Sequence, residues 1–415
     1  MKKIMFSFAI FGALCSVLCA QDSNSQDDIK YLAFMRTPED VFNQHHPETI
    51  NVAGFNEITR HFADLPNSKV KPGIGFIFSY LKTDIDTVQV DLKRFLSLSL
   101  KTNTPVLVKL DGEQWWQNRP DLWNWWDPEL PGYDPNNRNN VEWRWWEPEY
   151  AIKIAWRNWG RQLRVLPPPN LMSPAYRNAC HEAMDQLMPI VLDWYKALPD
   201  DKKYLFIGLN LGWESSIGMN AYYYPNGNDL IDVPEIDDVH KPYIHDDVLS
   251  RGYVQIGYAS VKTAGIRTSG DINESDIVKV SQMHVEDLCK RAYDFGFPRE
   301  KIFSHGVGNP KGEKLYDVAL NKYSCPGWST YDRPDMPESN IGINRCLDIS
   351  DANQWAATEW LLLAPHEKAL WKTAFEKTLS YRNCKYLCVF NWELIRKSPE
   401  VIEAAREVIK ENAIK

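Results

Sequence analysis

The feature that most constrains the fold is an alternation of short apolar runs with longer amphipathic stretches, which begins near residue 70. The runs that predict β-strands are 73–80, 105–110, 204–211, 301–305, 323–330, 354–358 and 385–391. Helical periodicity and length fit the stretches 176–198, 275–295 and 366–381. Strands that alternate with helices predict a parallel sheet with helical crossovers.

One further strand, the third in order, is expected somewhere in the tryptophan-rich region between the second and fourth runs. Eight strands are the number that a (β/α)8 TIM barrel requires. The alternative is an open doubly wound sheet, but no glycine-rich phosphate turn follows the first run. We therefore predict an α/β fold with a single (β/α)8 barrel and long tryptophan-rich loops at its carboxyl face.

Residues 1–20 predict a secretory signal peptide. Lys2 and Lys3 form a basic start, and an apolar segment follows and ends in Ala20. We expect an exported protein, periplasmic or secreted. A lipid-anchored surface form through Cys19 is the less favoured alternative, because the residues before this cysteine do not resemble a lipidation signal.

The remaining chain is expected to hold one domain. Residues 21–30 are polar and predict a disordered linker, and residues 31–415 form the predicted barrel domain. No later apolar run is long enough to span a membrane. The net charge of −8 argues against nucleic acids and anionic membranes as partners, whereas neutral glycans remain compatible. The sequence makes no prediction of oligomeric state.

Ten of the 17 tryptophans lie between Trp115 and Trp159. Carboxylates from Asp111 to Glu149 are interspersed among them. A hydrophobic core gains as much from leucine or isoleucine, which have no indole N–H to satisfy. Flat rings beside acceptors are what a saccharide cleft needs, so this cluster predicts a carbohydrate substrate. The alternative is the packing of an unusually aromatic loop region.

Acids and aromatic residues recur where the predicted strands end. In a barrel, these positions face one common cleft. Asp111 and Glu113 follow the second predicted strand, and Glu214 follows the fourth. The candidates for contact with substrate are Asp111, Glu113, Trp115, Trp116, Trp213, His305, Trp328, Tyr331, Trp360, Asn391, Trp392 and Glu393.

Glu214 and Glu359 are the candidate catalytic residues. Glycoside hydrolysis needs two carboxyl groups that face each other across the scissile bond. Although 145 positions separate these two residues in the sequence, the fourth and seventh strands stand on opposing sides of a barrel mouth. The pair therefore predicts a glycosidase.

At these residues the chain resembles the retaining (β/α)8 glycoside hydrolases of clan A. The motif Thr358-Glu359-Trp360, followed by a helix and the aromatic last strand at Asn391-Trp392, carries the resemblance. It implies that Glu214 is the acid/base and Glu359 the nucleophile, with Tyr331 and His305 placed to hydrogen-bond them. The chain departs from the clan in one position, because Trp213 stands where the clan usually has an asparagine.

Two other functions stay open. One is a non-catalytic carbohydrate-binding protein of a glycan uptake system, which would need the aromatic residues but no carboxylate pair. The other is an inverting hydrolase that uses Asp111 or Glu113. Glu393 is read as a hydroxyl-binding or structural acid rather than as the nucleophile.

No cofactor and no metal site are predicted. The histidines lack metal-ligand spacing, and no Cys-x-x-Cys pair is present. Six cysteines follow the signal segment, an even number that permits disulfides in an exported chain. Cys325 and Cys346 are the pair that best fits a disulfide, and buried free thiols are the alternative.

Overall fold

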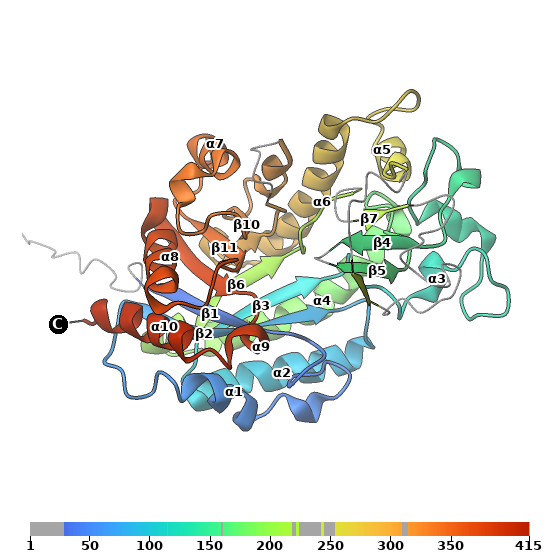
Figure 1. Ribbon diagram of the computed structural model, residues 1–415. Coiled ribbons are helices and arrows are strands. Elements are labelled where there is room, and N and C mark those ends of the chain that lie inside the picture. Colours follow the sequence, from blue (N-terminus) through green and yellow to red (C-terminus); the bar gives the residue numbers. More distant parts are fainter. Residues whose placement is uncertain are drawn as a thin grey trace, which may run out of the picture.

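A computed structural model describes residues 29–113, 115–158, 161–217, 221–223, 242–244, 254–308 and 314–414. Eight parallel strands form one sheet in the order β10-β11-β12-β1-β2-β3-β6-β9 (Figure 1). Parallel bridges Phe303–Cys325 and Gly306–Trp328 join β9 to β10 and close the barrel. The strands are β1 (Lys30–Arg36), β2 (Val70–Ser79), β3 (Val106–Asp111), β6 (Phe206–Leu211), β9 (Ile302–Ser304), β10 (Gly327–Thr330), β11 (Trp355–Trp360) and β12 (Cys384–Val389).

Helices follow the strands and cover the barrel, as Figure 1 shows for α1, α2, α8 and α10. The predicted helices 176–198, 275–295 and 366–381 are confirmed as α4, α6 and α8. The α-helices are α1 (Val52–Thr59), α2 (Ile85–Thr102), α3 (Pro120–Trp123), α4 (Pro174–Ala197), α5 (Tyr258–Thr263), α6 (Glu274–Phe295), α7 (Ile341–Ile349), α8 (Lys368–Ser380), α9 (Trp392–Ile395) and α10 (Pro399–Glu411).

The (β/α)8 barrel is confirmed, but two of its strands were misassigned. The first strand is β1, which begins at Lys30, a residue that the sequence placed in the linker. The runs expected to be the first and second strands are therefore the second and third. The prediction of a barrel strand in the tryptophan-rich region is wrong, because β1 completes the set of eight strands.

The tryptophan-rich region forms short helices and part of a separate sheet. This small antiparallel sheet has the order β7-β4-β5-β8. It comprises β4 (Ala155–Asn158), β5 (Arg161–Val165), β7 (Ala221–Tyr222) and β8 (Pro242–Ile244). Figure 1 shows β4, β5 and β7 grouped with α3 and α5 at one end of the barrel. Since this region follows β3 in the chain, it lies at the carboxyl face, as the sequence predicts.

The alternation of side chains in the strands separates two cores. In β3, Leu107 belongs to the cluster inside the barrel, whereas Val106 and Val108 belong to the larger cluster between strands and helices. Successive side chains in a strand point to opposite faces, and both faces of this sheet are covered. The strands are therefore largely apolar on both faces, and a charged residue in the middle of one of them is conspicuous.

The expected disulfide between Cys325 and Cys346 is wrong. Both are buried free thiols, and Cys346 Sγ lies 3.3 Å from Asp317 Oδ1. Within the described residues, no helix has the length and apolar character needed to cross a bilayer. The predicted signal peptide and Trp159 lie outside the described residues.

Candidate active site

The chain turns tightly after β6 and presents Glu214 at the carboxyl face. Gly212 has φ +80° and Glu214 has φ +52°, so both occupy the left-handed region. A side chain at Gly212 would meet Ser215 Oγ at 2.6 Å, which explains the glycine. Left-handed backbone is uncommon at a residue other than glycine, and the surrounding structure must hold it in place.

A bulge in β11 turns Glu359 into the barrel. Trp328 pairs with Ala357 and Ser329 pairs with Glu359, so the register shifts by one residue between them. Trp360 then packs outward on Phe375 of α8, with ring centroids 4.9 Å apart. An extra residue in one strand re-aims the side chains that follow it. Glu359 thereby faces the opposite strands although Trp360 remains in the outer core.

Both carboxylate oxygens of Glu359 have a donor. Lys109 Nζ in β3 lies 2.6 Å from Oε1, and the hydroxyl of Tyr331 donates to Oε2 at 2.6 Å. Lys109 is fully buried, and Glu359 is 2% exposed. The Lys109 ammonium also lies 4.7 Å from the centre of the Trp213 ring. A buried carboxylate that accepts from an ammonium group and a hydroxyl is held in a fixed orientation.

Glu214 is electrostatically different from Glu359. Burial raises the pKa of Glu214 to about 7, and the negative charge of Glu359 contributes in the same direction. A hydrogen bond with Ser329 and the charges of Lys109 and Arg157 oppose this rise. A buried carboxyl with a raised pKa beside a second carboxyl is typical of a general acid.

His305 completes the polar group at the centre of the barrel mouth. Its Nε2 lies 2.9 Å from Ser329 Oγ, and burial together with the charge of Lys109 lowers its pKa well below the usual value. The imidazole is therefore neutral at physiological pH. One carboxylate oxygen of Glu214, one of Glu359 and a ring nitrogen of His305 all lie within 4.8 Å of one another.

The same three side chains have the ligand types of a divalent cation site. However, both oxygens of Glu359 already accept from Lys109 and Tyr331. A metal ion would have to displace one of these donors and would lie close to the Lys109 ammonium. The arrangement fits a metal ion poorly.

Asp111 and Glu113 follow the third barrel strand, not the second as expected, and their carboxyls belong to an internal network. Asp111 accepts from the backbone N–H of Glu113 at 3.0 Å and from the Ser79 hydroxyl at 3.3 Å. The Ser215 hydroxyl donates to Glu113 Oε1 at 2.5 Å, and His284 Nε2 lies 3.1 Å from the same oxygen. This network ties β3 to the turn that carries Glu214.

Four tryptophans that were predicted to contact substrate are core residues instead, and all four are at most 2% exposed. Each indole N–H donates to an acceptor within the protein. A buried indole N–H needs such an acceptor, and this need was the reason for not expecting these rings in the core. Trp116 donates to the carbonyl of Pro167, Trp328 to that of Tyr316, Trp360 to the hydroxyl of Thr378 and Trp392 to Glu57.

Asn391 and Glu393 also have structural partners. Asn391 Oδ1 caps α9 by accepting from the backbone N–H of Leu394 at 3.0 Å. Glu393 Oε1 accepts from Arg36 Nη1 at 2.9 Å, which fastens α9 to the end of β1.

Trp115 and Trp213 differ from the four core tryptophans. Trp115 is half-buried, and the Lys82 ammonium lies 5.1 Å from the centre of its ring. Trp213 is 7% exposed and contacts Lys109 beside Glu359. Of the predicted binding residues, Trp213, His305 and Tyr331 thus lie with the two glutamates.

Sequence reasoning missed Lys109, Ser329 and Arg157. Lys109 had a recognisable signal, because it stands alone among the apolar residues of β3, and a lysine buried in a strand needs a partner. Ser329 and Arg157 had none. Arg157 belongs to the small sheet, and only the folded chain brings its charge close to Asp111, Glu113 and Glu214.

The chain is similar to known proteins in fold but not in sequence. No protein-family model matches it, and neither does any curated protein. The catalytic domain of a β-amylase from Paenibacillus polymyxa has a TM-score of 0.51 at 10% identity, with 94% of this chain and 99% of that chain covered.

Two further solved structures resemble it less closely. A GH5-4 broad-specificity endoglucanase from an uncultured bacterium has a TM-score of 0.47 at 8% identity, with 93% of this chain and 95% of that chain covered. A glycoside hydrolase family 5 enzyme from Prevotella bryantii has a TM-score of 0.45 at 9% identity, with 93% and 98% covered. At 10% identity, the likeness to the β-amylase domain supports the barrel fold and nothing finer.

Proposed function

We propose that this protein is a glycoside hydrolase that cleaves a glycosidic bond in a poly- or oligosaccharide by a retaining mechanism with two carboxylates. The observation that carries the proposal is the pair of Glu214 and Glu359 at the ends of opposing strands. Their nearest carboxylate oxygens lie within 4.8 Å. Retention requires carboxyls about 5–5.5 Å apart, whereas inversion requires roughly 6.5–9.5 Å to admit a water molecule.

The partners of each glutamate support distinct roles. Lys109 and Tyr331 orient the carboxylate of Glu359 and offset its negative charge, so it suits attack on the anomeric carbon. Glu214, with its pKa of about 7, can keep a proton for the leaving oxygen. After the aglycone leaves, the same carboxylate can take a proton from the water that hydrolyses the glycosyl ester.

The remaining substrate contacts are assigned by proximity. We place Trp213, His305 and Tyr331 around the reacting sugar, and Trp115 further out on the carboxyl face. A ring that stacks on a sugar contributes on the order of 1 kcal/mol, similar to an aromatic pair. The alternative use of Asp111 or Glu113 as the catalytic acid receives less support, because the carboxyl grouped with Glu359 and His305 within 4.8 Å is that of Glu214.

The deciding experiment measures release of reducing ends from a panel of plant, algal and host glycans. Glu359→Ala should abolish release, and added azide should restore turnover of aryl glycosides as a glycosyl azide of inverted anomeric configuration. Glu214→Ala should spare the first step for aryl glycosides with good leaving groups, which need no proton. Glu129→Gln, at an exposed loop position, serves as the control with unchanged activity.

Two outcomes would contradict the proposal. Full activity in both glutamate variants, with loss in Asp111→Ala, would move the chemistry to the internal network. Tight glycan binding without cleavage of any substrate would favour the non-catalytic carbohydrate-binding protein.

We also propose that the protein is exported, periplasmic or secreted, which suits a polysaccharide substrate outside the cytoplasm. The proposal rests on the composition of residues 1–20. Cell fractionation together with the mass of the purified protein tests it. A mature chain that starts near Gln21 would support export, an intact Met1 in the cytoplasm would contradict it, and a lipid-modified Cys19 would identify the anchored form.

A further inference from the structure

Two adjoining cavities lie beside the proposed catalytic centre, where the chain leaves the carboxyl ends of β10 and β11. Their volumes are about 250 and 480 Å³. Tyr331, Asp332 and Leu363 line both cavities, so the two spaces meet along these residues. The larger cavity extends to α8, which lies beside β11 in Figure 1. We call the two cavities together the outer groove.

The smaller cavity borders on the groups proposed for catalysis, because Ser329 and Tyr331 form part of its wall. The Tyr331 hydroxyl donates to Glu359 Oε2 at 2.6 Å, and Ser329 Oγ lies 2.9 Å from His305 Nε2. A ligand in this cavity therefore contacts the same side chains that hold the catalytic groups. The outer groove is continuous with the proposed active site.

Hydrogen bonds between neighbouring elements fix the shape of the outer groove. The Thr330 hydroxyl donates to the carbonyl of Glu359 at 3.2 Å, which joins the ends of β10 and β11. The Thr378 hydroxyl of α8 donates to the carbonyl of Pro334 at 2.8 Å. The segment after β10 is thereby attached to β11 on one side and to α8 on the other. Such a preformed site loses little conformational entropy when a ligand binds.

Apolar side chains open to solvent form part of the wall. Leu363 is 73% exposed and Leu370 is 43% exposed, and both line the larger cavity together with the buried Leu362. A single exposed leucine is ordinary, but a group of apolar side chains at one concave surface indicates a binding site. The C–H faces of a sugar ring are apolar and suit such a wall.

The polar groups of the outer groove favour hydroxyls over anions. Its charged lining residues, among those that the structure describes, are Asp332, Asp335 and Arg333. Arg333 Nε lies 3.3 Å from Asp335 Oδ1, so two acids share one cation and the wall carries a net negative charge. The exposed Asp332 can accept hydrogen bonds from sugar hydroxyls, and Thr373 adds a neutral hydroxyl. An acidic sugar would be repelled by the same wall.

We propose that the outer groove binds successive units of a neutral sugar chain whose reacting unit lies between Glu214 and Glu359. The inference rests on the proposed function, because that pair sets where the chain begins. One unit occupies the smaller cavity beside Tyr331, and the next units cross Leu363 into the larger cavity, where Asp332 accepts from their hydroxyls. The substrates are therefore neutral oligo- or polysaccharides and not single glycosides or acidic chains.

Isothermal titration calorimetry with the Glu214→Gln protein tests the proposal. This variant lacks the acid that unactivated sugars need for cleavage, so the bound chain stays intact. The probes are cello-, manno- and malto-oligosaccharides of two and five units, and pentagalacturonate as the acidic chain. We expect one neutral series to bind, with the pentasaccharide at least tenfold tighter than its disaccharide. Pentagalacturonate should bind at least tenfold more weakly than that neutral pentasaccharide.

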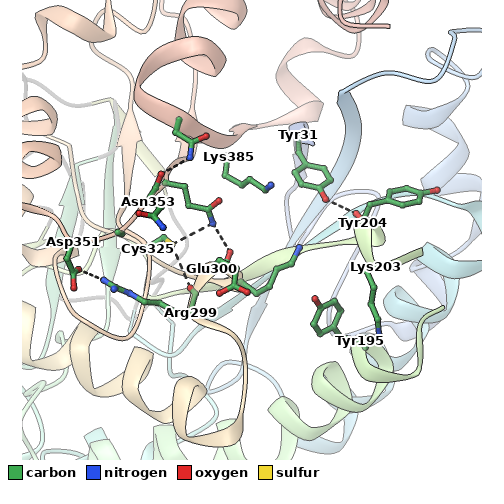
Figure 2. A pocket seen from close by; sticks show the side chains of 14 residues that line it. Tyr31, Tyr195, Lys203, Tyr204, Arg299, Glu300, Cys325, Asp351, Asn353 and Lys385 are labelled. Atoms are coloured by element: carbon green, nitrogen blue, oxygen red, sulfur yellow. Dashed lines mark hydrogen bonds and ion pairs between the residues drawn. The ribbon is translucent and has the colours of Figure 1, made fainter. Parts of the chain in front are cut away.

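Further changes in the same background locate the chain. Leu363→Ala and Asp332→Ala should each weaken binding of the pentasaccharide about tenfold, whereas Leu363→Met should retain most of it because the apolar surface remains. Leu100→Ala, on the exposed side of α2, and Asp351→Ala are matched controls that should bind unchanged. Figure 2 shows Asp351 paired with Arg299 in a cavity at the amino ends of the strands, away from the outer groove. Equal thermal melting confirms that the variants fold.

Four results would overturn the proposal. They are no heat of binding from any neutral pentasaccharide at millimolar concentration, equal affinity for disaccharide and pentasaccharide, equal affinity for pentagalacturonate, and binding that is unchanged in both Leu363→Ala and Asp332→Ala.

Failure of the outer groove and failure of the hydrolase give different results. Hydrolysis of the same probes by the unaltered protein is measured separately from binding. Cleavage of a neutral glycan together with any of the four results keeps the hydrolase and removes the outer groove. Binding with the expected length dependence and the expected losses, but without cleavage of any probe, keeps the outer groove and removes the hydrolase.

Discussion

The ammonium of Lys109 lies 2.6 Å from Glu359 Oε1, and neither side chain has meaningful access to water. Two opposite charges removed from solvent stabilise a fold only when each finds its partner. Here the pair bridges β3 and β11 across the barrel interior. It therefore links the stability of the barrel to the charge state of one proposed catalytic group.

Replacing Lys109 should lower both the stability of the fold and the glycosidase activity. Lys109→Met leaves Glu359 buried without a cation, which typically lowers the free energy of unfolding by about 3–5 kcal/mol. Glycosidase activity should also fall at least a hundredfold, because the proposed nucleophile loses the ammonium group that orients it. Urea denaturation and turnover of an aryl glycoside measure the two effects.

A double variant separates the two effects of Lys109. Lys109→Met combined with Glu359→Gln has no unpaired buried charge, so most of the lost stability should return while activity stays absent. If the double variant is as unstable as the sum of the single changes, the two residues are not energetically coupled and the ion pair is incidental.

The raised pKa of Glu214 predicts a defined pH dependence. The carboxyl keeps its proton up to pH of about 7 in the folded protein, but only to about 4.5 when unfolded. Activity that needs this proton should decline as the pH rises through 7. Between pH about 4.5 and about 7 the folded state loses the advantage of the protonated form, so the free energy of unfolding should fall by up to about 3 kcal/mol across that interval.

Glu214→Gln isolates that contribution. Burial also raises the pKa of Asp91 to about 7 and that of Glu142 to about 8, so the unaltered protein loses stability in this window for several reasons. Glu214→Gln should gain stability relative to the unaltered protein above pH 7 and little below pH 4.5. A difference that does not change with pH would contradict the raised pKa.

The periodicity of the chain sufficed for most of the barrel because each strand is apolar on both faces and each long helix has one apolar side. β1 escaped detection since it directly follows a polar segment and begins with a lysine. The same omission explains the wrongly predicted third strand. Without β1 only seven strands were recognised, so an eighth was expected in the tryptophan-rich region.

The sequence placed Glu214 and Glu359 at the ends of two opposing strands, and the structure has them there. It could not identify the side chains that form hydrogen bonds with them. Lys109 and Tyr331 reach Glu359 from β3 and the end of β10, over 250 and 28 positions of sequence. Aromatic density was the weaker indicator. An indole whose N–H donates to a backbone carbonyl packs well in a core, as Trp116 does. Composition alone cannot distinguish such a core tryptophan from one on the wall of a binding cleft.

Two tryptophans should separate core packing from substrate binding. Trp360→Ala removes a buried ring between β11 and α8 and should lower the free energy of unfolding by about 3–5 kcal/mol. Trp115→Ala, at a half-buried position, should cost much less stability and raise KM roughly tenfold. Thermal melting and steady-state kinetics measure both, and unchanged KM in Trp115→Ala would exclude this ring from the binding site.

The hydrogen bond between Ser215 and Glu113 predicts a positioning effect on Glu214. Ser215 follows Glu214 in the chain, and its hydroxyl anchors the left-handed turn to Glu113 at 2.5 Å. Ser215→Ala should leave KM nearly unchanged but lower kcat roughly tenfold for substrates that need a proton on the leaving oxygen. Aryl glycosides with good leaving groups should be less affected, because their first step needs no acid.

Ser216→Ala is the matched control for that prediction. The Ser216 hydroxyl is buried and makes no hydrogen bond to any of the described residues, so its loss should leave kcat unchanged and should not lower the free energy of unfolding. If Ser215→Ala slows both classes of substrate equally, the bond to Glu113 supports the turn in general and does not act through the proton of Glu214. If Ser215→Ala raises KM instead, the turn contacts the substrate, and the hydrogen bond to Glu113 contributes to substrate binding.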